Sequence, residues 1–441
     1  MAVPVSTFVQ GAARESRAPR SRPRAPAIDR RAATTAAEDP ALDRPMDPWL
    51  FIATAALTCL GVVMVYSAGI YTAQANYGNW EYFLRRQGLF ALIGLVLMLG
   101  VSRLDYRIFR RYARHLMVVG LIGLVAVLFL GTEVNGARRW LRYGINIQPS
   151  EIAKVALAIF LSATLAKQGE RVRRFRDGFL PVILVASLTM VLVLLEKDLG
   201  TTILLGALTL TALYVAGTRL AYVVAAIMLA APVVWHQIVG VGYRRSRFLD
   251  FVSGEHSYQI DQSLITIGSG GVWGVGLGAG RQKLGFLPEN HTDFILASIG
   301  EELGYVGIAA VIALYGLLVW RGLKAAQEAP DRFGTYLALC ISTLFGIQAL
   351  INMGVVLNLI PAKGITLPFL SYGGSSLLVS MGAIGILLAI SRRPRAWKIS
   401  DMRRSPSGGK SERGGKGKRD GKGDKDRKKR GGPRPNMRRS A

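Results

Sequence analysis

The chain has 441 residues, of which 51% are hydrophobic, and its formal net charge is +27 at pH 7. Apolar segments long enough to cross ~30 Å of hydrocarbon recur along it, which excludes a soluble globular protein. The positive charge is concentrated in the two ends and in alternate loops, so nucleic-acid binding is not expected.

The composition divides the chain into three parts. Residues 1–47 are rich in Arg, Pro, Ala and Ser, and residues 392–441 are of low complexity and rich in Gly, Lys, Arg and Asp. Neither end can bury enough apolar area to fold, so we predict a disordered basic arm and a disordered basic tail, both cytoplasmic. The tail is either simply solvated or binds anionic lipid headgroups. Residues 48–391 are predicted to form one transmembrane domain.

Hydropathy predicts an all-α, polytopic membrane protein with about ten transmembrane helices. The apolar segments fall near Pro48–Ala68, Gly88–Val101, Leu116–Leu130, Ile152–Leu165, Phe179–Leu195, Thr201–Gly217, Leu220–Val239, Phe294–Trp320, Tyr336–Leu357 and Leu370–Ile390. A polar linker, Thr72–Phe83, separates the first two segments. A long extracytoplasmic loop, from about Gly240 to Thr292, separates the seventh and eighth.

The Lys and Arg residues of the short loops predict the orientation. Loops such as Arg103–Arg114 and Lys167–Arg176 are strongly basic and are expected to be cytoplasmic, together with both termini. Two loops on the opposite, outer side nevertheless carry cations: Arg138, Arg139 and Arg142 in one, and Arg244, Arg245, Arg247, Arg281 and Lys283 in the other. Cations placed against the insertion bias indicate an anionic ligand, with salt bridges inside the loops as the alternative.

The long outer loop is glycine-rich from Gly268 onward and ends in a group of ionisable residues, Leu287–Asp293. Asp293 lies where this loop enters the membrane. Partial desolvation there would raise its pKa toward that of a general base. The alternative is that Thr292 or Asp293 caps a helix beginning at Phe294. Glu289 and His291 are flanking candidates.

Other ionisable residues lie within or beside apolar segments. Glu151 and Lys154 are spaced to pair on one helix face, either as a structural ion pair or beside a bound pyrophosphate. Asp198 adds an acid at the outer turn Glu196–Gly200. Glu301 and Glu302 are expected to form a polar interior or to pair with an arginine.

Small residues occur at the start of the last apolar segment. Gly373, Gly374, Ser375 and Ser376 favour close helix packing, with substrate contact as the alternative.

The sequence contains no Walker loop, no HExxH motif and no dinucleotide fingerprint after a strand. The free energy for any reaction is therefore expected to come from an activated substrate.

Several motifs together resemble the SEDS family (shape, elongation, division and sporulation), whose branches include FtsW, RodA and SpoVE. They are NGARRW at Asn135–Trp140, QPSEIAK at Gln148–Lys154, DLGTT at Asp198–Thr202, SYQIDQSLITIGSGG at Ser257–Gly271, QKLGFLPENHTDFI at Gln282–Ile295, GEELG at Gly300–Gly304 and LPFLSYGGSS at Leu367–Ser376. The resemblance covers most of residues 48–391. The KGITLP segment, Lys363–Pro368, is more similar to the division branch (FtsW) than to the elongation branch (RodA). Lys197 stands where the family more often has proline.

The resemblance implies a peptidoglycan glycosyltransferase that polymerises lipid II at the outer face of the cytoplasmic membrane, and the expected location is the division septum. It places the family's essential acid on Asp293. It also implies substrate contact by Arg139, Glu151, Lys154, Asp198, Arg244, Arg247, Gln262, Lys283, Glu289, His291, Thr292, Lys363, Ser371 and Ser375. The only cofactor it allows is a divalent cation, Mg²⁺ or Mn²⁺, at the pyrophosphate.

The expected partners are a class B penicillin-binding transpeptidase, other division proteins and membrane lipids. Three alternatives stay open at this point. A bundle of about ten helices with buried charges also describes a lipid II flippase or transporter. A non-catalytic scaffold for the transpeptidase is the second alternative, and a polymerase of the elongation type is the third.

Overall fold

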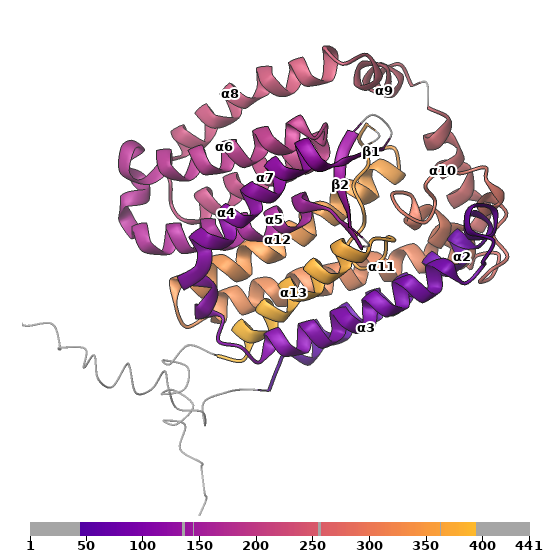
Figure 1. Cartoon of the computed structure of the whole chain (residues 1–441), viewed down its shortest axis with the longest axis horizontal. Helices are drawn as coiled ribbons and strands as arrows, with labels where there is room; N and C mark the ends of the chain where they lie inside the picture. The colour runs from indigo at the N-terminus through magenta and orange to yellow at the C-terminus, as the bar shows by residue number, and fades with distance from the viewer. Residues whose placement is uncertain (1–44, 135–136, 144, 255–256, 362, 394–441) are drawn as a thin grey trace, which may run out of the picture. The chain divides into compact units, whose positions relative to one another are not determined.

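The structure, a computed structural model, describes residues 45–393 apart from 135–136, 144, 255–256 and 362. Nearly all of the predicted N-terminal arm and of the C-terminal tail therefore lies outside the described residues. Ten helices make up the bundle (Figure 1): α2 Pro48–Tyr77, α3 Tyr82–Ser102, α4 Arg107–Leu130, α5 Pro149–Gln168, α6 Leu180–Leu195, α7 Leu199–Val215, α8 Leu220–Val239, α11 Ile295–Glu328, α12 Arg332–Val356 and α13 Gly374–Ser391.

The predicted all-α membrane fold is confirmed. Within the described ranges, nine helices are long and apolar enough to cross a membrane, and α7 is a shorter apolar helix of 17 residues. Each predicted apolar segment corresponds to one of these ten helices. In the bundle, α3 packs along α13, α4 along α5, and α11 against both α12 and α2.

The predicted linker Thr72–Phe83 is wrong for most of its length. Helix α2 continues past its apolar part to Tyr77, and α3 begins at Tyr82. Gly78 ends α2 with a φ of 63°, a left-handed conformation that glycine adopts without steric cost, and its N–H donates to Gln74 O. The turn between the two helices is therefore only a few residues long.

The outer loops hold more regular structure than their composition predicts. A three-stranded antiparallel sheet lies between α4 and α5, formed by β1 Thr132–Val134, β2 Ala137–Tyr143 and β3 Ile145–Ile147. The long loop contains α9, Gly242–Ser253, and α10, Tyr258–Gly270, followed by a 3₁₀ turn at Gln282–Leu284. The first glycines of the glycine-rich segment are thus helical, and the irregular part starts at Gly271.

Helix α11 is interrupted at Gly304, where φ is 66° and ψ is −167°. The glycine-rich segment fills the interruption: Val275 N donates to Glu301 O, and Tyr305 N donates to Gly271 O. These bonds replace helical ones, because backbone groups inside a membrane need partners within the protein.

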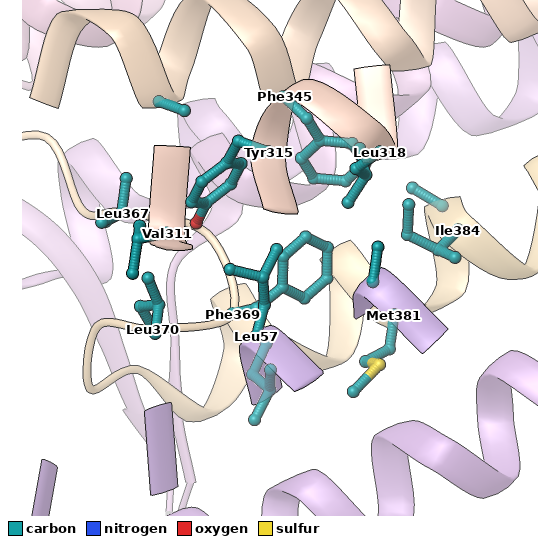
Figure 2. Close-up of a cluster of buried hydrophobic side chains, with 14 of the residues drawn as sticks. Leu57, Val311, Tyr315, Leu318, Phe345, Leu367, Phe369, Leu370, Met381 and Ile384 are labelled. Carbon is teal, nitrogen blue, oxygen red and sulfur yellow. The ribbon is translucent and has the colours of Figure 1, made fainter. Parts of the chain in front are cut away.

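The segment between α12 and α13 enters the bundle as a loop. Leu367, Phe369 and Leu370 are buried among side chains of α2, α11, α12 and α13 (Figure 2). Gly61 of α2 permits this approach, because a Cβ there would lie 2.3 Å from Phe369 O. Helix α13 consequently begins at Gly374 and not near Leu370 as predicted.

Candidate functional site

Asp293 lies in the turn that joins the long loop after α8 to α11. Thr292 N and Phe294 N both donate to Glu289 O, and Glu289 has a positive φ of 57°. Helix α11 begins at Ile295, its N-cap residue is Phe294, and no side chain caps it. The alternative in which Thr292 or Asp293 caps this helix is therefore wrong.

Three consecutive backbone carbonyl groups of the turn accept hydrogen bonds from α12 and from the segment between α12 and α13. Tyr372 N donates to His291 O at 2.9 Å, and Ser371 Oγ donates to Thr292 O at 2.6 Å. Asn352 Nδ2, from α12, donates to Asp293 O at 2.8 Å. The backbone beside the Asp293 carboxyl is thus fixed by α12 and by the loop that enters the bundle.

A cavity of about 300 Å³ lies beside this turn. Its charged and polar lining residues are Arg139, Lys197, Asp198, Arg244, Arg247 and Lys363, and the others are Leu199, Gly200, Ile238, Phe248, Pro361 and Gly364. Gly364 brings the cavity to Asp293, because a Cβ at this position would lie 2.8 Å from Asp293 Oδ2. The carboxylate therefore borders a cavity that is rich in cations.

The arginines of the cavity are positioned by the turn between α6 and α7. Arg139, in β2, donates to Glu196 O at 3.2 Å and to Lys197 O at 2.8 Å. Arg244, in α9, donates to Lys197 O at 3.1 Å and to Gln237 Oε1 at 2.7 Å. Three segments far apart in the sequence thus meet at one turn.

Burial and neighbouring charges shift the pKa of Asp293. Burial raises this pKa to about 7, the carboxylates of Glu289 and Asp198 add to the rise, and Arg139 and Arg247 oppose it. A carboxyl group with a pKa near neutrality is suited to accept a proton at physiological pH.

The same surroundings shift the pKa values of three neighbouring groups. Burial lowers the pKa of His291, against the effect of Glu289, and favours the neutral imidazole. Burial and the charge of Arg244 lower the pKa of Lys363. The buried Glu196 has its pKa raised to about 8, by burial and then by Asp198, so it holds its proton at neutral pH.

Of the predicted substrate-contacting residues, the structure gathers five around the cavity and three in the Asp293 turn. Arg139, Asp198, Arg244, Arg247 and Lys363 line the cavity. Glu289 is exposed, and Thr292 Oγ1 donates to its carboxylate at 2.7 Å. The His291 ring lies against Phe83, with ring centroids 4.7 Å apart.

Glu151 and Lys154 form a buried ion pair of 2.8 Å inside the bundle, and neither lines the cavity. Lys154 Nζ also donates to Gln348 Oε1 at 3.0 Å, and Gln348 Nε2 donates to Thr366 O at 2.9 Å. Of the two alternatives, this arrangement agrees with the structural ion pair. It also supports the loop that carries Gly364. Pyrophosphate contact by the pair stays a prediction.

Lys283 belongs to a second buried network. Its ammonium donates to Gly278 O at 2.6 Å and pairs with Glu302 at 3.2 Å, and Ser67 Oγ donates to the same carboxylate. Glu301 Oε1 accepts from Arg281 N at 2.7 Å. The two glutamates therefore form a polar interior, and their partners are a lysine, a serine and backbone amides in place of the predicted arginine side chain.

The remaining predicted residues lie elsewhere. Gln262 is half-buried in α10, and Ser375 Oγ accepts from Gln148 N at 3.3 Å at the start of α13. Arg138 pairs with Glu133 at 3.6 Å on the surface, as the salt-bridge alternative predicts. The side chain of Arg142 lies outside the described residues. Gly374 packs against Phe90 of α3, which agrees with the close-packing alternative for the small residues.

Sequence reasoning missed Gly364, Gln348 and Asn352. The two amides are spaced i, i+4 on α12, and Asn352 Nδ2 also donates to Ile365 O at 2.7 Å. A usable signal existed, because polar side chains within an apolar helix usually have a specific partner.

Among the described residues, no three His, Cys, Asp or Glu side chains are grouped so as to hold a metal ion by themselves. Mg²⁺ is, however, often held by one or two carboxylates together with substrate phosphates. Asp198 is the carboxylate that lines the cavity. A divalent cation at a pyrophosphate stays a prediction.

Known proteins that resemble the chain share one family. The sequence model of the FtsW, RodA and SpoVE family, described as a cell cycle protein, matches residues 48–396. A probable peptidoglycan glycosyltransferase FtsW of Trichlorobacter lovleyi is 46% identical over 350 residues, 78% of this chain and 92% of the relative. The stage V sporulation protein E of Bacillus subtilis is 38% identical over 357 residues, 79% of this chain and 98% of the relative.

Two solved structures share the fold over most of the chain. The rod shape determining protein RodA of Thermus thermophilus aligns with a TM-score of 0.60 and 28% identity, over 79% of this chain and 97% of that one. A chain from a structure described as structural coordination of polymerization and crosslinking by a peptidoglycan synthase complex aligns with a TM-score of 0.66. It is 28% identical and covers 79% of this chain and 98% of that one.

Proposed function

The chain belongs to the FtsW/RodA/SpoVE family of cell cycle proteins, and we propose that it polymerises lipid II into glycan strands with Asp293 as the general base. It is a multi-pass membrane protein and a peptidoglycan glycosyltransferase of the division type. The observation that carries the proposal is that Gly364, which lines a cavity with several cations, lies directly against the Asp293 carboxyl.

The proposed reaction is a single displacement. Asp293 accepts the proton of the acceptor's 4-hydroxyl group while the hydroxyl oxygen attacks the anomeric carbon of the donor. The bond from that carbon to the pyrophosphate oxygen breaks, and its electron pair leaves with undecaprenyl pyrophosphate. One displacement inverts the anomeric centre and needs no second carboxylate as nucleophile.

The cations of the cavity would stabilise the leaving group. Arg139, Arg244, Arg247 and Lys363 line the cavity. A charge-stabilising donor that is already in place contributes about 3 kcal/mol to lowering a barrier of this kind. Because Arg139 and Arg244 are held by backbone carbonyls of the α6–α7 turn, little reorganisation is needed during the reaction.

A lipid-linked donor needs a route from the bilayer. Helix α8 packs on α7 and α9, and of its 20 residues Val223 alone is buried, so its apolar side chains are available to lipid. Ile238, at the end of α8, lines the cavity. The lipid tail would therefore lie along α8 while the pyrophosphate reaches the arginines.

The basic segment Arg103–Arg114 covers the turn between α3 and α4 and the first two turns of α4. Under the proposal both termini are cytoplasmic and Asp293 faces outward, since short cytoplasmic loops carry an excess of Lys and Arg. The proposed partner is a class B penicillin-binding transpeptidase, together with other division proteins at the septum.

The test is polymerisation of lipid II by the purified full chain, with and without its transpeptidase. Asp293→Asn keeps the size of the side chain but removes the base, so glycan strands should be lost. Glu133→Gln, which changes an exposed acid at the same end of the bundle, is the matched control. Polymer made by a folded Asp293→Asn variant would contradict the base assignment, and transport of lipid II without polymer would favour a flippase.

A further inference from the structure

The turn between α2 and α3 presents aromatic side chains at the Asp293 end of the bundle. Helix α2 extends several residues past its apolar part and ends at Tyr77, after the polar residues Gln74 and Asn76. The side chains of Tyr77 and Trp80 are 53% and 49% exposed, and Tyr82 is half-buried. We call Tyr77, Trp80 and Tyr82 the aromatic surface.

A continuous series of rings joins Tyr77 and Tyr82 of this surface to the Asp293 turn, and Trp80 flanks the series through a contact with Tyr66 at 6.0 Å. Tyr77 and Tyr82 are stacked almost in parallel, with centroids 3.8 Å apart, and Tyr82 meets Phe83 at 5.4 Å. Phe83 in turn contacts His291 at 4.7 Å and Tyr372 at 4.8 Å. His291 precedes Asp293 by two residues, so the aromatic surface is mechanically coupled to the turn that holds the proposed base.

The aromatic surface and the cationic cavity approach Asp293 by different elements. The residues that line the cavity come from β2, the α6–α7 turn, α8, α9 and the loop before α13, with none from α2 or α3. Figure 1 shows α9 and the α2–α3 turn well apart. Asp293 is therefore reached by cations along one set of elements and by aromatic rings along another.

These two kinds of surface suit different parts of the reacting molecules. Cations bind phosphate groups, whereas the electron-rich face of an aromatic ring attracts the polarised C–H groups on one face of a pyranose ring. Arg86 lies over the Tyr82 ring, 5.5 Å from its centroid, and adds a hydrogen-bond donor for sugar oxygens or carboxylates.

We propose that the aromatic surface binds pyranose rings of the growing glycan strand and holds them for transfer at Asp293. This inference rests on the proposed function and adds a saccharide subsite to it, separate from the cationic cavity. Stacking on Tyr77 and Trp80 keeps the strand attached between additions, so the surface sets how many sugars are added before release.

Exposed aromatic residues are also common where a membrane meets water. Tyr77, Tyr82 and Phe83, however, form a series of contacts that leads to the Asp293 turn, which an interfacial position alone does not require. Trp273, in the glycine-rich segment, is 80% exposed and stands outside this series, so it supplies the matched control for an interfacial aromatic residue.

The test uses a soluble probe, the neutral hexamer of β-1,4-linked N-acetylglucosamine, added to the full chain in lipid nanodiscs. Calorimetry should show binding that Tyr77→Ala and Trp80→Ala each weaken by about fivefold or more, the magnitude expected for one lost ring stack. Tyr77→Phe keeps the ring and should retain binding, and Trp273→Ala should not weaken it. Thermal unfolding midpoints show whether each variant is folded.

Two results would overturn the subsite: no hexamer binding by the folded chain, or equal weakening by Trp273→Ala and Tyr77→Ala. The Asp293→Asn variant should still bind the hexamer. Hexamer binding in a chain that makes no polymer would support the subsite and contradict the proposed function, whereas polymerisation without hexamer binding would contradict the subsite alone. In polymerisation assays, Tyr77→Ala should give shorter strands with the KM for lipid II unchanged.

Discussion

Gly364 lies directly against the carboxylate of Asp293, at a separation where an added Cβ would come 2.8 Å from Asp293 Oδ2. Gly364 also lines the cationic cavity, and its backbone does not adopt a positive φ. The position therefore requires the absence of a side chain and not the conformational freedom of glycine. Any side chain here would fill the space between the cavity and the carboxylate.

Replacing Gly364 with alanine should lower the rate of polymerisation strongly. The methyl group would displace the Asp293 carboxylate or occupy the space of the acceptor hydroxyl, and misplacement by about 1 Å can reduce a rate ~10²-fold. The measurement is kcat with lipid II. Gly268→Ala, at a position with open space in α10, is the control. A Gly364→Ala variant as active as this control would show that the contact is unimportant.

The pH dependence of the reaction should report the pKa of Asp293, which is raised to about 7. A general base acts when deprotonated, so kcat/KM should increase with pH, reach half of its maximum near pH 7 and become constant about one pH unit higher. Glu289→Gln removes a negative charge that raises this pKa and should move the profile to lower pH. Arg247→Gln removes a positive charge that lowers it and should move the profile to higher pH.

The opposite directions of these two shifts provide the internal control, because a general loss of stability would not move the profiles apart. Glu289 is exposed, so its effect should weaken as salt is added. A profile that stays unchanged in both variants would exclude Asp293 as the titrating group.

The helices were predictable because each apolar segment is long enough to span a bilayer and must form its backbone hydrogen bonds internally. Asp293 was also identifiable, as an acid at the point where a loop meets an apolar segment. The incorrect predictions concern where helices end and which side chains contact one another. Helix α2 reaches Tyr77 although its last turns are polar, because α3 and the Gly78 turn support it.

The composition of the site was less predictable than its central residue. The arginines of β2 and α9 were recognised by their position on the outer side, but their common anchor at the α6–α7 turn depends on tertiary folding. Gly364 carries no chemical group, so its role appears only when Asp293 is placed beside it. Gln348 and Asn352 stand out in the sequence as amides within an apolar helix, but the backbone carbonyls that they bind cannot be identified from it.

The buried pair Glu151–Lys154 should behave as a structural element. Lys154→Met leaves Glu151 as an unpaired buried charge, and this should destabilise the fold by about 3–5 kcal/mol. The double variant Glu151→Gln/Lys154→Met removes both charges and should recover most of that stability. Unfolding measurements on the three proteins check this expectation. A folded double variant with a sharply raised KM for lipid II would instead indicate contact with the substrate.

Gly304 should be intolerant of any side chain. Its φ of 66° with ψ of −167° belongs to a region that other residues rarely adopt, at a cost of about 1–3 kcal/mol. A Cβ there would also lie 2.4 Å from both Gly274 N and Val272 O, so the glycine-rich segment would have to move out of the interruption in α11.

Gly304→Ala should therefore lower the thermal unfolding midpoint. It should also reduce polymerisation, because Lys283 and the Asp293 turn come after the glycine-rich segment in the sequence and would be displaced with it. Gly316→Ala, in the same helix with open space around it, should change neither quantity. Equal stability of the two variants would mean that the interruption at Gly304 is dispensable.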